Sequence, residues 1–277
     1  MSTWHSETET REAPIGAMGY LRAVLRGVPL AIVTFGCLAL LLLVRLVERP
    51  LFGLRRPVTP YITQFVCRSA FVILRIRLDV EGRPMTQMGA AVSNHCSWLD
   101  IFTLNASKRI YFVSKAEVAA WPGIGWLARA TGTVFINRKK AEAKTHKTMF
   151  EDRLRAGHRL LFFPEGTSTD GLRVLPFKST LFAAFVTDEM RKDLWIQPVS
   201  LVYTAPKGED PRFYGWWGDM DFAHHLVKTL AARTQGSVKI VYHPPLAMAD
   251  VTDRKGLAKT LEQTVRSALP SPQDMAD

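Results

Sequence analysis

The stretch Ser93-Asn94-His95-Cys96-Ser97-Trp98-Leu99-Asp100 places a carboxylate five positions after a histidine, where a short apolar run has just ended. This run, Gly89-Ala90-Ala91-Val92, is typical of a buried strand, so the histidine lies at a strand end. Residues 98–102 then begin a helical pattern. We expect the loop to fold back, so that Asp100 contacts one imidazole nitrogen of His95 and leaves the other free to accept a proton.

A carboxylate beside an imidazole fixes the tautomer of the ring and stabilises the imidazolium that proton transfer creates, as in the serine-hydrolase triad. The hydroxyl that loses its proton could here belong to a substrate, and the chain then needs no nucleophilic side chain. The His95-x4-Asp100 pattern has low specificity alone, because a histidine at a strand end is more often structural. The other motifs must decide between the two interpretations.

Short apolar runs alternate with helical patterns from residue 76 onward. The predicted strands are 76–80, 90–93, 110–113, 134–136, 160–163, 196–202 and 238–242. The predicted helices are 99–106, 125–130, 141–155, 180–190, 222–233 and 254–268. This alternation predicts an α/β fold with a mixed, partly parallel sheet flanked by helices. Functional sites in such sheets gather at the ends of strands.

Two further motifs lie at predicted strand ends. Residues 132–140 form a short strand that runs into a basic cluster, in which Arg138 offers a planar donor fork for phosphate. A solvated helix start is the alternative interpretation of this cluster. The second motif, Gln197-Pro198-Val199, opens another strand, and its proline indicates a bend or an edge position.

The most specific of the additional motifs is Pro164-Glu165-Gly166-Thr167-Ser168, which follows the apolar residues 161–163. Gly166 allows the backbone to approach a ligand closely. Glu165 is placed to bind an acceptor hydroxyl or amine. The alternative is a capped turn with Glu165 on the surface.

The N-terminal part of the chain has a different character. Residues 1–16 are polar and lack a core pattern, so we expect a disordered tail. Residues 28–44 contain no charge, and these 17 residues stand at the short end of the roughly 17–25 that span a bilayer. Arginines flank the run on both sides, so the charge rule does not fix an orientation. A single span, a helix within one leaflet and a buried core helix remain open.

A second apolar helix is predicted over residues 61–74, after a linker marked by Pro50, Pro57 and Pro60. Arg68 is its only charge, and its length is too short to span a bilayer. With the first helix it forms a membrane-associated hairpin, unless it is an ordinary core helix. The expected organisation is therefore a tail (1–16), membrane-associated helices with a linker (17–75) and one α/β domain (76–277).

Charge and cysteine content restrict the partners and the compartment. The 277 residues include 36 Lys and Arg against 25 Asp and Glu, which gives a net charge of +11. Such a chain favours anionic partners: phosphate head groups, an acidic carrier protein, a membrane surface or nucleic acid. The three cysteines are an odd number without metal-type spacing, which argues for a reducing compartment and against a disulfide framework.

Four motifs taken together resemble one family. In chain order they are His95-x4-Asp100, Phe135-Ile136-Asn137-Arg138, Phe163-Pro164-Glu165-Gly166-Thr167 and Gln197-Pro198-Val199. Their order and spacing resemble the glycerolipid acyltransferase family, which includes the lysophosphatidic acid acyltransferases, over roughly residues 76–205. The resemblance implies transfer of a fatty acyl group from a carrier thioester to a lipid hydroxyl.

The resemblance also implies a role for each motif residue. His95 would be the general base and Asp100 its orienting partner. Arg138 would bind an anionic group, and the turn of Glu165, Gly166, Thr167 and Ser168 would place the acceptor. A thioester is already activated, so deprotonation of the hydroxyl and stabilisation of an oxyanion suffice, with no metal or organic cofactor.

The chain departs from the family pattern at one position. Family members with a phosphate acceptor carry Arg directly after Glu-Gly-Thr, whereas this chain has Ser168, followed by Thr169 and Asp170. Loss of the cation weakens the case for a phosphomonoester, and an acidic Asp170 suits an amino head group better. Glu-Gly-Thr-Ser, with Tyr-Gly-Trp-Trp-Gly-Asp-Met at 214–220, resembles the bacterial branch that acylates lyso-ornithine lipid.

We therefore expect a lyso-aminolipid acceptor ahead of lysophosphatidic acid, with Arg173 or Lys178 as possible substitutes for the missing cation. The implied donor is acyl carrier protein or acyl-coenzyme A, both anionic. The implied location is the bacterial inner membrane, with the active site at its cytoplasmic face. No nucleic acid partner is expected.

Three rival interpretations are weaker. A Cys96 acyl-enzyme is chemically possible, but Cys96 adjoins His95, and neighbouring side chains seldom point at each other. A zinc site lacks recognisable ligand spacing, and His224-His225 fits a pair on a helix surface. A membrane-tethered basic binding protein explains the charge but not the ordered motifs.

Overall fold

An eight-stranded sheet organises the computed structural model, which describes residues 4–6, 14–137, 143–183, 191–251 and 253–270. The strands are β1 (Arg77–Gly82), β2 (Gly89–Ser93), β3 (Tyr111–Lys115), β4 (Val134–Ile136), β5 (Leu160–Phe162), β6 (Trp195–Thr204), β7 (Ser237–Tyr242) and β8 (Leu246–Ala247). Their order is β1-β7-β6-β2-β5-β3-β4, and β8 pairs with β6. The predicted strands are all present, and β8 was not predicted.

The sheet is mixed. The pairs β1–β7, β6–β2, β2–β5, β5–β3 and β3–β4 are parallel, whereas β6 pairs with β7 and β8 in antiparallel fashion. The predicted α/β fold with a partly parallel sheet is therefore confirmed. Because β2, β5 and β6 are parallel neighbours, their carboxyl ends meet at one edge of the sheet, and the loops after them share that edge.

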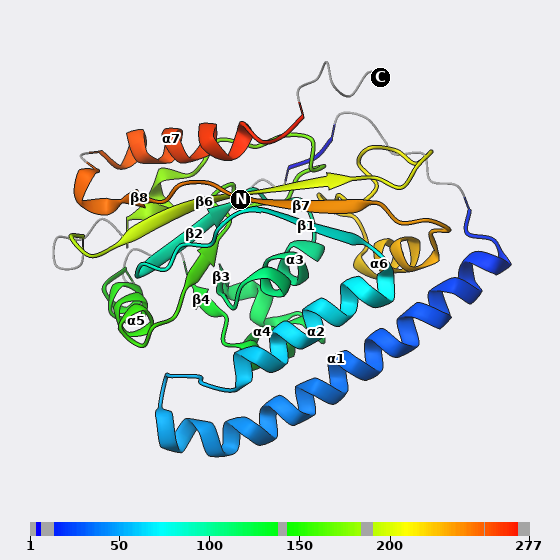
Figure 1. Ribbon diagram of the computed structural model, residues 1–277, viewed down its shortest axis with the longest axis horizontal. Coiled ribbons are helices and arrows are strands. Elements are labelled where there is room, and N and C mark those ends of the chain that lie inside the picture. The colour runs from blue at the N-terminus through cyan, green and yellow to red at the C-terminus, as the bar shows by residue number, and fades with distance from the viewer. Residues whose placement is uncertain (1–3, 7–13, 138–142, 184–190, 252, 271–277) are drawn as a thin grey trace.

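Helices cover both faces of this sheet. They are α1 (Ala17–Phe52), α2 (Thr59–Leu74), α3 (Leu99–Ser107), α4 (Ile124–Thr131), α5 (Ala143–Arg155), α6 (Phe222–Ala231) and α7 (Arg254–Arg266), with 3-10 turns η1 (Ala116–Ala120), η3 (Ser179–Phe182) and η4 (Met248–Asp250). In Figure 1, α7 lies above the sheet, α2, α3, α4 and α6 lie below it, and α1 is outermost. Of the helix predicted at 180–190, the described part is η3, and residues 184–190 lie outside the described residues.

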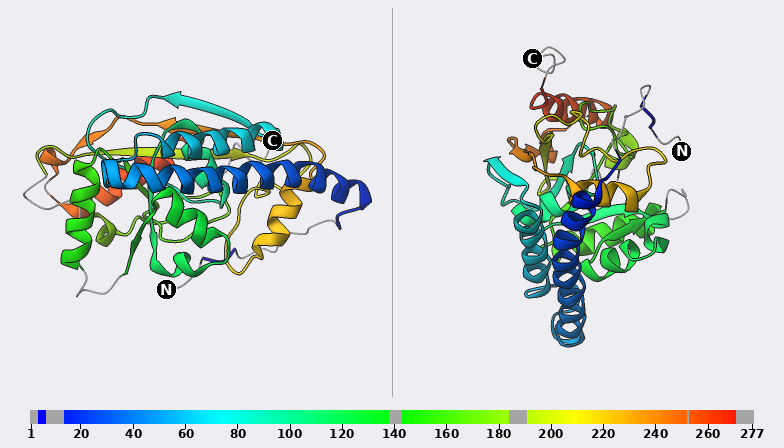
Figure 2. Two further views of the ribbon diagram at one scale, coloured as in Figure 1. Left: turned by 90° about the horizontal axis from the view of Figure 1, so that it is seen from below. Right: turned by 90° about the vertical axis from the view of Figure 1, so that its right-hand side faces the viewer.

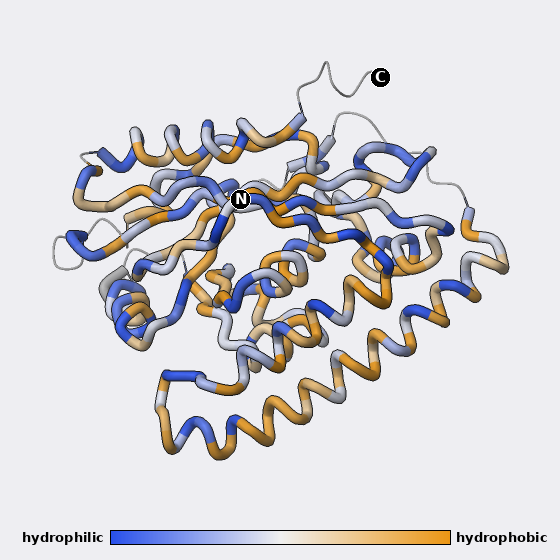
Figure 3. The backbone as a smooth tube through the Cα atoms, viewed as in Figure 1, coloured by the Kyte–Doolittle hydropathy of each residue, from blue (hydrophilic) through white to orange (hydrophobic). Residues whose placement is uncertain are grey.

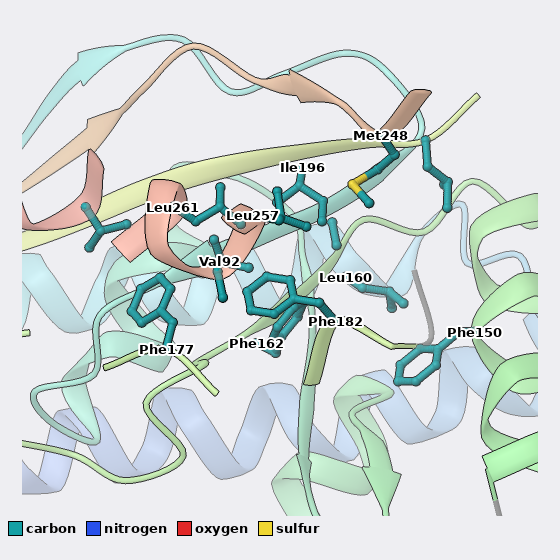
Figure 4. Close-up of a cluster of buried hydrophobic side chains, with 14 of the residues drawn as sticks. Val92, Phe150, Leu160, Phe162, Phe177, Phe182, Ile196, Met248, Leu257 and Leu261 are labelled. Atoms are coloured by element: carbon teal, nitrogen blue, oxygen red, sulfur yellow. The ribbon is translucent and has the colours of Figure 1, made fainter. Parts of the chain in front are cut away.

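Side-chain alternation along β5 explains the two layers of the core. Leu160 and Phe162 belong to the buried cluster that also contains Ile196 and Leu261, on the face of the sheet that α7 covers (Figure 4). Leu161, between them, joins the cluster on the opposite face. Successive strand residues point to opposite faces of a sheet, so a continuous apolar run marks a strand that is buried on both sides.

Pro198 does not lie at an edge, because β6 is an interior strand. On one side of β6, β8 pairs as far as Ile196 and β7 begins at Val199. The Pro198 carbonyl accepts the His243 N–H on that side, so the proline nitrogen faces the interval between the two partner strands. Its missing N–H therefore removes no bond from either ladder.

The two N-terminal helices form a hairpin along the domain. Helix α1 has 36 residues and continues through Pro29 and Pro50, so Pro50 is not part of the linker. At 1.5 Å per residue α1 is about 54 Å long. It is long and apolar enough to cross a membrane, as the hydrophobic colouring in Figure 3 illustrates, and few residues of its apolar stretch are buried. Its first half packs on α6, where Arg22 and Arg26 donate to the carbonyls of residues 230–232.

The hairpin also contacts α3, the helix that follows β2. Helix α2 packs on α3 (Figures 1 and 2), and Gln64 and Arg68 donate to the Ala106 carbonyl near the end of α3. Arg68, the only charge of α2, is thus a partner for α3 carbonyls that lack intrahelical partners. Of the predicted tail, residues 1–3 and 7–13 lie outside the described residues, whereas residues 4–6 contact the domain.

A buried carboxylate holds the hairpin closed. The Glu48 side chain, near the end of α1, is 3% exposed. One of its oxygens accepts the backbone N–H groups of Val58 and Thr59, at 2.8 and 3.1 Å, and the other accepts the Thr59 hydroxyl at 2.7 Å and Arg45 at 2.9 Å. Glu48 therefore satisfies N–H groups at the start of α2 from the neighbouring helix.

Replacing Glu48 by Ala should lower the free energy of unfolding by about 2 kcal/mol, because the buried donors at the start of α2 lose their acceptor. Chemical unfolding of the detergent-solubilised protein measures this change. Glu81→Ala is a matched control, since the Glu81–Lys239 ion pair is at the surface and contributes under about 1 kcal/mol. Equal effects of the two substitutions would rule out the proposed role of Glu48.

Candidate active site

The predicted contact between His95 and Asp100 is present. The His95 Nδ1 atom lies 2.7 Å from Asp100 Oδ2. His95 follows the end of β2, and Asp100 lies in the first turn of α3. The loop between them folds back, as expected, because the carboxylate also accepts the backbone N–H groups of Cys96 at 2.8 Å and Ser97 at 3.1 Å.

Asp100 is completely buried, so its charge requires several donors. His95, Cys96 and Ser97 supply three to Oδ2, and the Tyr203 hydroxyl supplies a fourth to Oδ1 at 2.8 Å. Burial and then the nearby Asp100 carboxylate raise the pKa of Tyr203 well above its usual range, so this hydroxyl remains a donor. Tyr203 was not predicted, because it is 103 residues from Asp100 and lies in an ordinary strand pattern.

Two backbone anchors fix the position of His95. The Asn94 side chain donates to the Leu201 carbonyl at 2.9 Å and accepts the Leu201 N–H at 2.8 Å, which ties the end of β2 to β6. The His95 carbonyl accepts the Thr169 N–H at 2.9 Å. The loops after β2 and β5 are therefore bound to each other at the histidine itself.

The His95 imidazole is held in place by packing and remains partly accessible to solvent. Phe163 stacks on it with ring centroids 4.1 Å apart and an interplanar angle of 13°. The His95 side chain is 23% exposed. Among the residues that the structure describes, none contacts Nε2 by a hydrogen bond, so this nitrogen is available to an incoming hydroxyl.

The Glu165 side chain accepts hydrogen bonds from backbone N–H groups, including that of His95, and does not face a substrate. Its Oε1 atom accepts the His95 N–H and its Oε2 atom accepts the Leu175 N–H, both at 2.7 Å, and the residue is 1% exposed. Burial raises the pKa of Glu165 to about 8. Gly166 follows with φ of +71°, a conformation that favours glycine and that turns the chain away from the buried carboxylate. The geometry gives no support to direct binding of the acceptor by Glu165.

The remaining predicted residues divide into three groups. Thr167 and Ser168 are half-buried in the turn after Gly166. Arg138 lies outside the described residues. Asp170 is buried and paired with Arg173, whose Nη2 lies 3.0 Å from Oδ2, so its carboxylate is not open to an amino head group.

The rival nucleophile is poorly placed. Cys96 is buried, and burial raises the pKa of its thiol well above the usual range, which disfavours the reactive thiolate. A Cβ atom at Gly171 would lie 2.7 Å from the Cys96 sulfur, so the thiol packs directly against the loop after β5. The predicted surface pair of histidines is wrong in part: His225 is buried and accepts the Trp98 ring N–H at 2.9 Å.

One depression at the described surface is separate from the dyad. It has a volume of about 790 Å³ and lies between β4, α5 and the turn after α1. Neither His95 nor Asp100 lines it. The site at the strand ends therefore contains a fixed imidazole, that of His95. Its Nε2 atom is accessible, and its Nδ1 atom is paired with the Asp100 carboxylate.

Comparisons with known proteins agree with this geometry. A family model described as Acyltransferase matches residues 77–202. A lyso-ornithine lipid O-acyltransferase of Rhodobacter capsulatus is 58% identical over 96% of this chain and 96% of its own, and one of Brucella abortus is 37% identical over 69% of this chain and 73% of its own. The crystal structure of a 1-acyl-sn-glycerophosphate acyltransferase from Thermotoga maritima has a TM-score of 0.63 and 21% identity, covering 91% of this chain and 93% of that one, and so shares the fold.

The buried Glu165 predicts a pH-dependent stability. Its pKa rises from 4.5 to about 8 on burial, so between these values the folded chain keeps a proton that the unfolded chain has released. The free energy of unfolding should therefore fall as the pH rises across this window, by at most about 1.4 kcal/mol per pH unit. Denaturation from pH 5 to 8, compared with Glu165→Gln, isolates this contribution. Parallel pH profiles for the two proteins would contradict the assignment.

Proposed function

Since this chain belongs to the acyltransferase family, we propose that it moves a fatty acyl group from a carrier thioester to the free hydroxyl of lyso-ornithine lipid. The product is the diacylated membrane lipid. The observation that carries the choice of acceptor is the 58% identity, over 96% of both chains, to a protein with that name. The dyad at the end of β2 supports the chemistry.

His95 acts as the general base in this proposal. Its Nε2 atom takes the proton of the lipid hydroxyl as the oxygen attacks the thioester carbonyl. Asp100 holds Nδ1 at 2.7 Å, keeps the reactive tautomer and stabilises the imidazolium. The tetrahedral intermediate then collapses, the carbon–sulfur bond breaks, and His95 returns the proton to the leaving thiolate. Atoms and protons balance without a covalent enzyme intermediate.

The supporting residues act through His95. Tyr203 donates to Asp100 and thereby keeps the carboxylate oriented. Glu165 fixes the backbone of His95 and the start of the following turn. In this assignment Thr167 and Ser168, which are half-buried in the turn after Gly166, contact the acceptor, and Glu165 places them.

The partners follow from charge and from the hairpin. A net charge of +11 suits an anionic donor, either acyl carrier protein or acyl-coenzyme A. Helix α1 supports association with a membrane, where the acceptor is dissolved. We assign the protein to the bacterial inner membrane with its active site at the cytoplasmic face, where both donors are made.

Substitution of the dyad tests the mechanism. His95→Ala should lower kcat for acyl transfer by about 1,000-fold, because general base catalysis contributes roughly 100- to 10,000-fold. Asp100→Asn should lower it roughly 100-fold or more through the wrong tautomer. His224→Ala, on the exposed face of α6, is the matched control and should retain full turnover. A folded His95→Ala protein with normal turnover would refute the mechanism.

Side-by-side assays test the acceptor and the donor. Lyso-ornithine lipid and lysophosphatidic acid, each with acyl carrier protein and with coenzyme A as the thioester, give four rates. We expect a higher kcat/KM for lyso-ornithine lipid with at least one donor. A preference for lysophosphatidic acid with both donors would establish the alternative activity, 1-acyl-glycerol-3-phosphate acylation.

A further inference from the structure

Residues from the start of the chain lie on the active-site turn. The Trp4 N–H is 3.5 Å from the Thr167 hydroxyl oxygen. The Trp4 ring meets Trp217 edge to face, with centroids 5.9 Å apart. The next residue, His5, packs against Gly218, where an added Cβ would lie 2.9 Å from its ring. Trp4 is therefore part of the wall beside the catalytic turn, 163 residues away in sequence from the threonine that it contacts.

Arg173 lies between Trp4 and Asp170. Its guanidinium carbon is 5.1 Å from the centroid of the Trp4 ring, which is a cation–π contact. Its Nε and Nη2 atoms lie 3.2 and 3.0 Å from the two carboxylate oxygens of Asp170. One face and one edge of the guanidinium are thus occupied.

The other edge of this guanidinium is open. A guanidinium can bind a carboxylate through its Nε–Nη2 edge or through its Nη1–Nη2 edge. Within the part of the chain that the structure describes, no acceptor is bonded to Nη1, and the Arg173 side chain is 52% exposed. The Nη1–Nη2 edge is therefore available as a planar two-donor fork, while Trp4 and Asp170 hold the rest of the guanidinium.

Short contacts connect this fork to the catalytic histidine. The Thr169 N–H donates to the His95 carbonyl, and the Thr169 hydroxyl donates to the Arg173 carbonyl at 3.3 Å. On the other side, Trp4 contacts Thr167 in the turn that Glu165 ties to His95. The guanidinium thus lies on the same loop that borders the imidazole.

We infer that Arg173 binds the carboxylate of the acceptor head group through its open edge, and that Trp4 is the residue that positions it. This inference rests on the proposed function. Ornithine that is linked through its α-amino group retains a carboxylate and an ammonium group. The carboxylate matches the open fork of Arg173 in a bidentate geometry.

The Asp170 charge would make this fork select against a phosphomonoester. Asp170 is buried and contributes a negative charge directly behind Arg173. The Arg173 guanidinium already neutralises Asp170, so the pair has no net charge to offset a phosphate with about two negative charges, whereas a zwitterionic head group brings its own ammonium. The pair of Asp170 and Arg173 therefore favours binding of a zwitterionic head group over a dianionic one.

A pair of acceptors isolates the contact. The wild-type enzyme is assayed with lyso-ornithine lipid and with its carboxamide analogue, which has the same shape but no negative charge. We expect kcat/KM to favour the carboxylate by about 10- to 100-fold, since a charge-assisted hydrogen bond contributes roughly 1.5–3 kcal/mol. Arg173→Met should bring this ratio close to one, mainly by raising KM for the carboxylate. Arg155→Met, on the exposed last turn of α5, should leave the ratio unchanged.

Trp4 is tested by the same ratio. Trp4→Ala should reduce the preference for the carboxylate several-fold with little change in kcat, and Trp4→Phe should restore most of it by renewing the aromatic face. If Arg173→Met is unstable because Asp170 loses its partner, the double substitution of Asp170→Asn with Arg173→Met removes both charges and gives the same reading.

The outcomes are distinguishable. A wild-type ratio that survives Arg173→Met overturns the inference and leaves the proposed function intact. A ratio unchanged by Trp4→Ala removes Trp4 from the site. A wild-type enzyme that acylates neither ornithine acceptor but acylates lysophosphatidic acid refutes the proposed function itself, and this inference with it.

Discussion

The structure depends on one constraint: the Asp100 carboxylate is fully buried and therefore needs hydrogen-bond donors. Four groups meet it: an imidazole, two backbone N–H groups and a tyrosine hydroxyl. The backbone groups force the loop after β2 to fold back onto the first turn of α3. The same requirement that shapes the loop therefore also orients His95, and neither could change without leaving a charge unpaired in the core.

Other residues fix the positions of β2 and α3, the two elements that this loop connects. At the sheet, Asn94 joins β2 to β6, and Glu165 joins the loop after β5 to the backbone of His95. Away from the sheet, Gln64 and Arg68 of the hairpin hold the far end of α3. Helix α3 thus carries the acid at its start and contacts the N-terminal hairpin at its end, so the two are connected through roughly two turns of helix.

The features that were predictable from sequence are those with a local signature. Residues 134–136 were assigned to a strand without error, and the contact of His95 with Asp100 followed from their spacing. The features that were missed depend on partners distant in sequence. Tyr203 and Trp4 lie in unremarkable local patterns, and only the folded chain brings Tyr203 to Asp100 and Trp4 to the turn after β5.

Long-range pairing also explains why the environments of Pro198 and Glu165 were not predicted. The proline at 198 suggested a sheet edge, but the switch from β8 to β7 beside it removes the need for its N–H. Glu165 is part of a recognisable motif, yet a motif does not reveal that both carboxylate oxygens are used by backbone N–H groups. In both cases the residue type is evident from the sequence, whereas the direction in which the residue points depends on the fold.

The way in which α1 lies along the domain has a kinetic consequence. Arg22 and Arg26 near the start of α1 donate hydrogen bonds to α6, and Glu48 near its end accepts hydrogen bonds at the start of α2. The helix therefore lies along the domain and does not extend away from it. Under the proposed membrane association, an enzyme held in this way would keep its imidazole at a constant height above the bilayer. Its lipid substrate then arrives by lateral diffusion in two dimensions, while the thioester arrives from the bulk in three. Turnover in a cell would accordingly follow the surface density of the lysolipid, not its overall concentration.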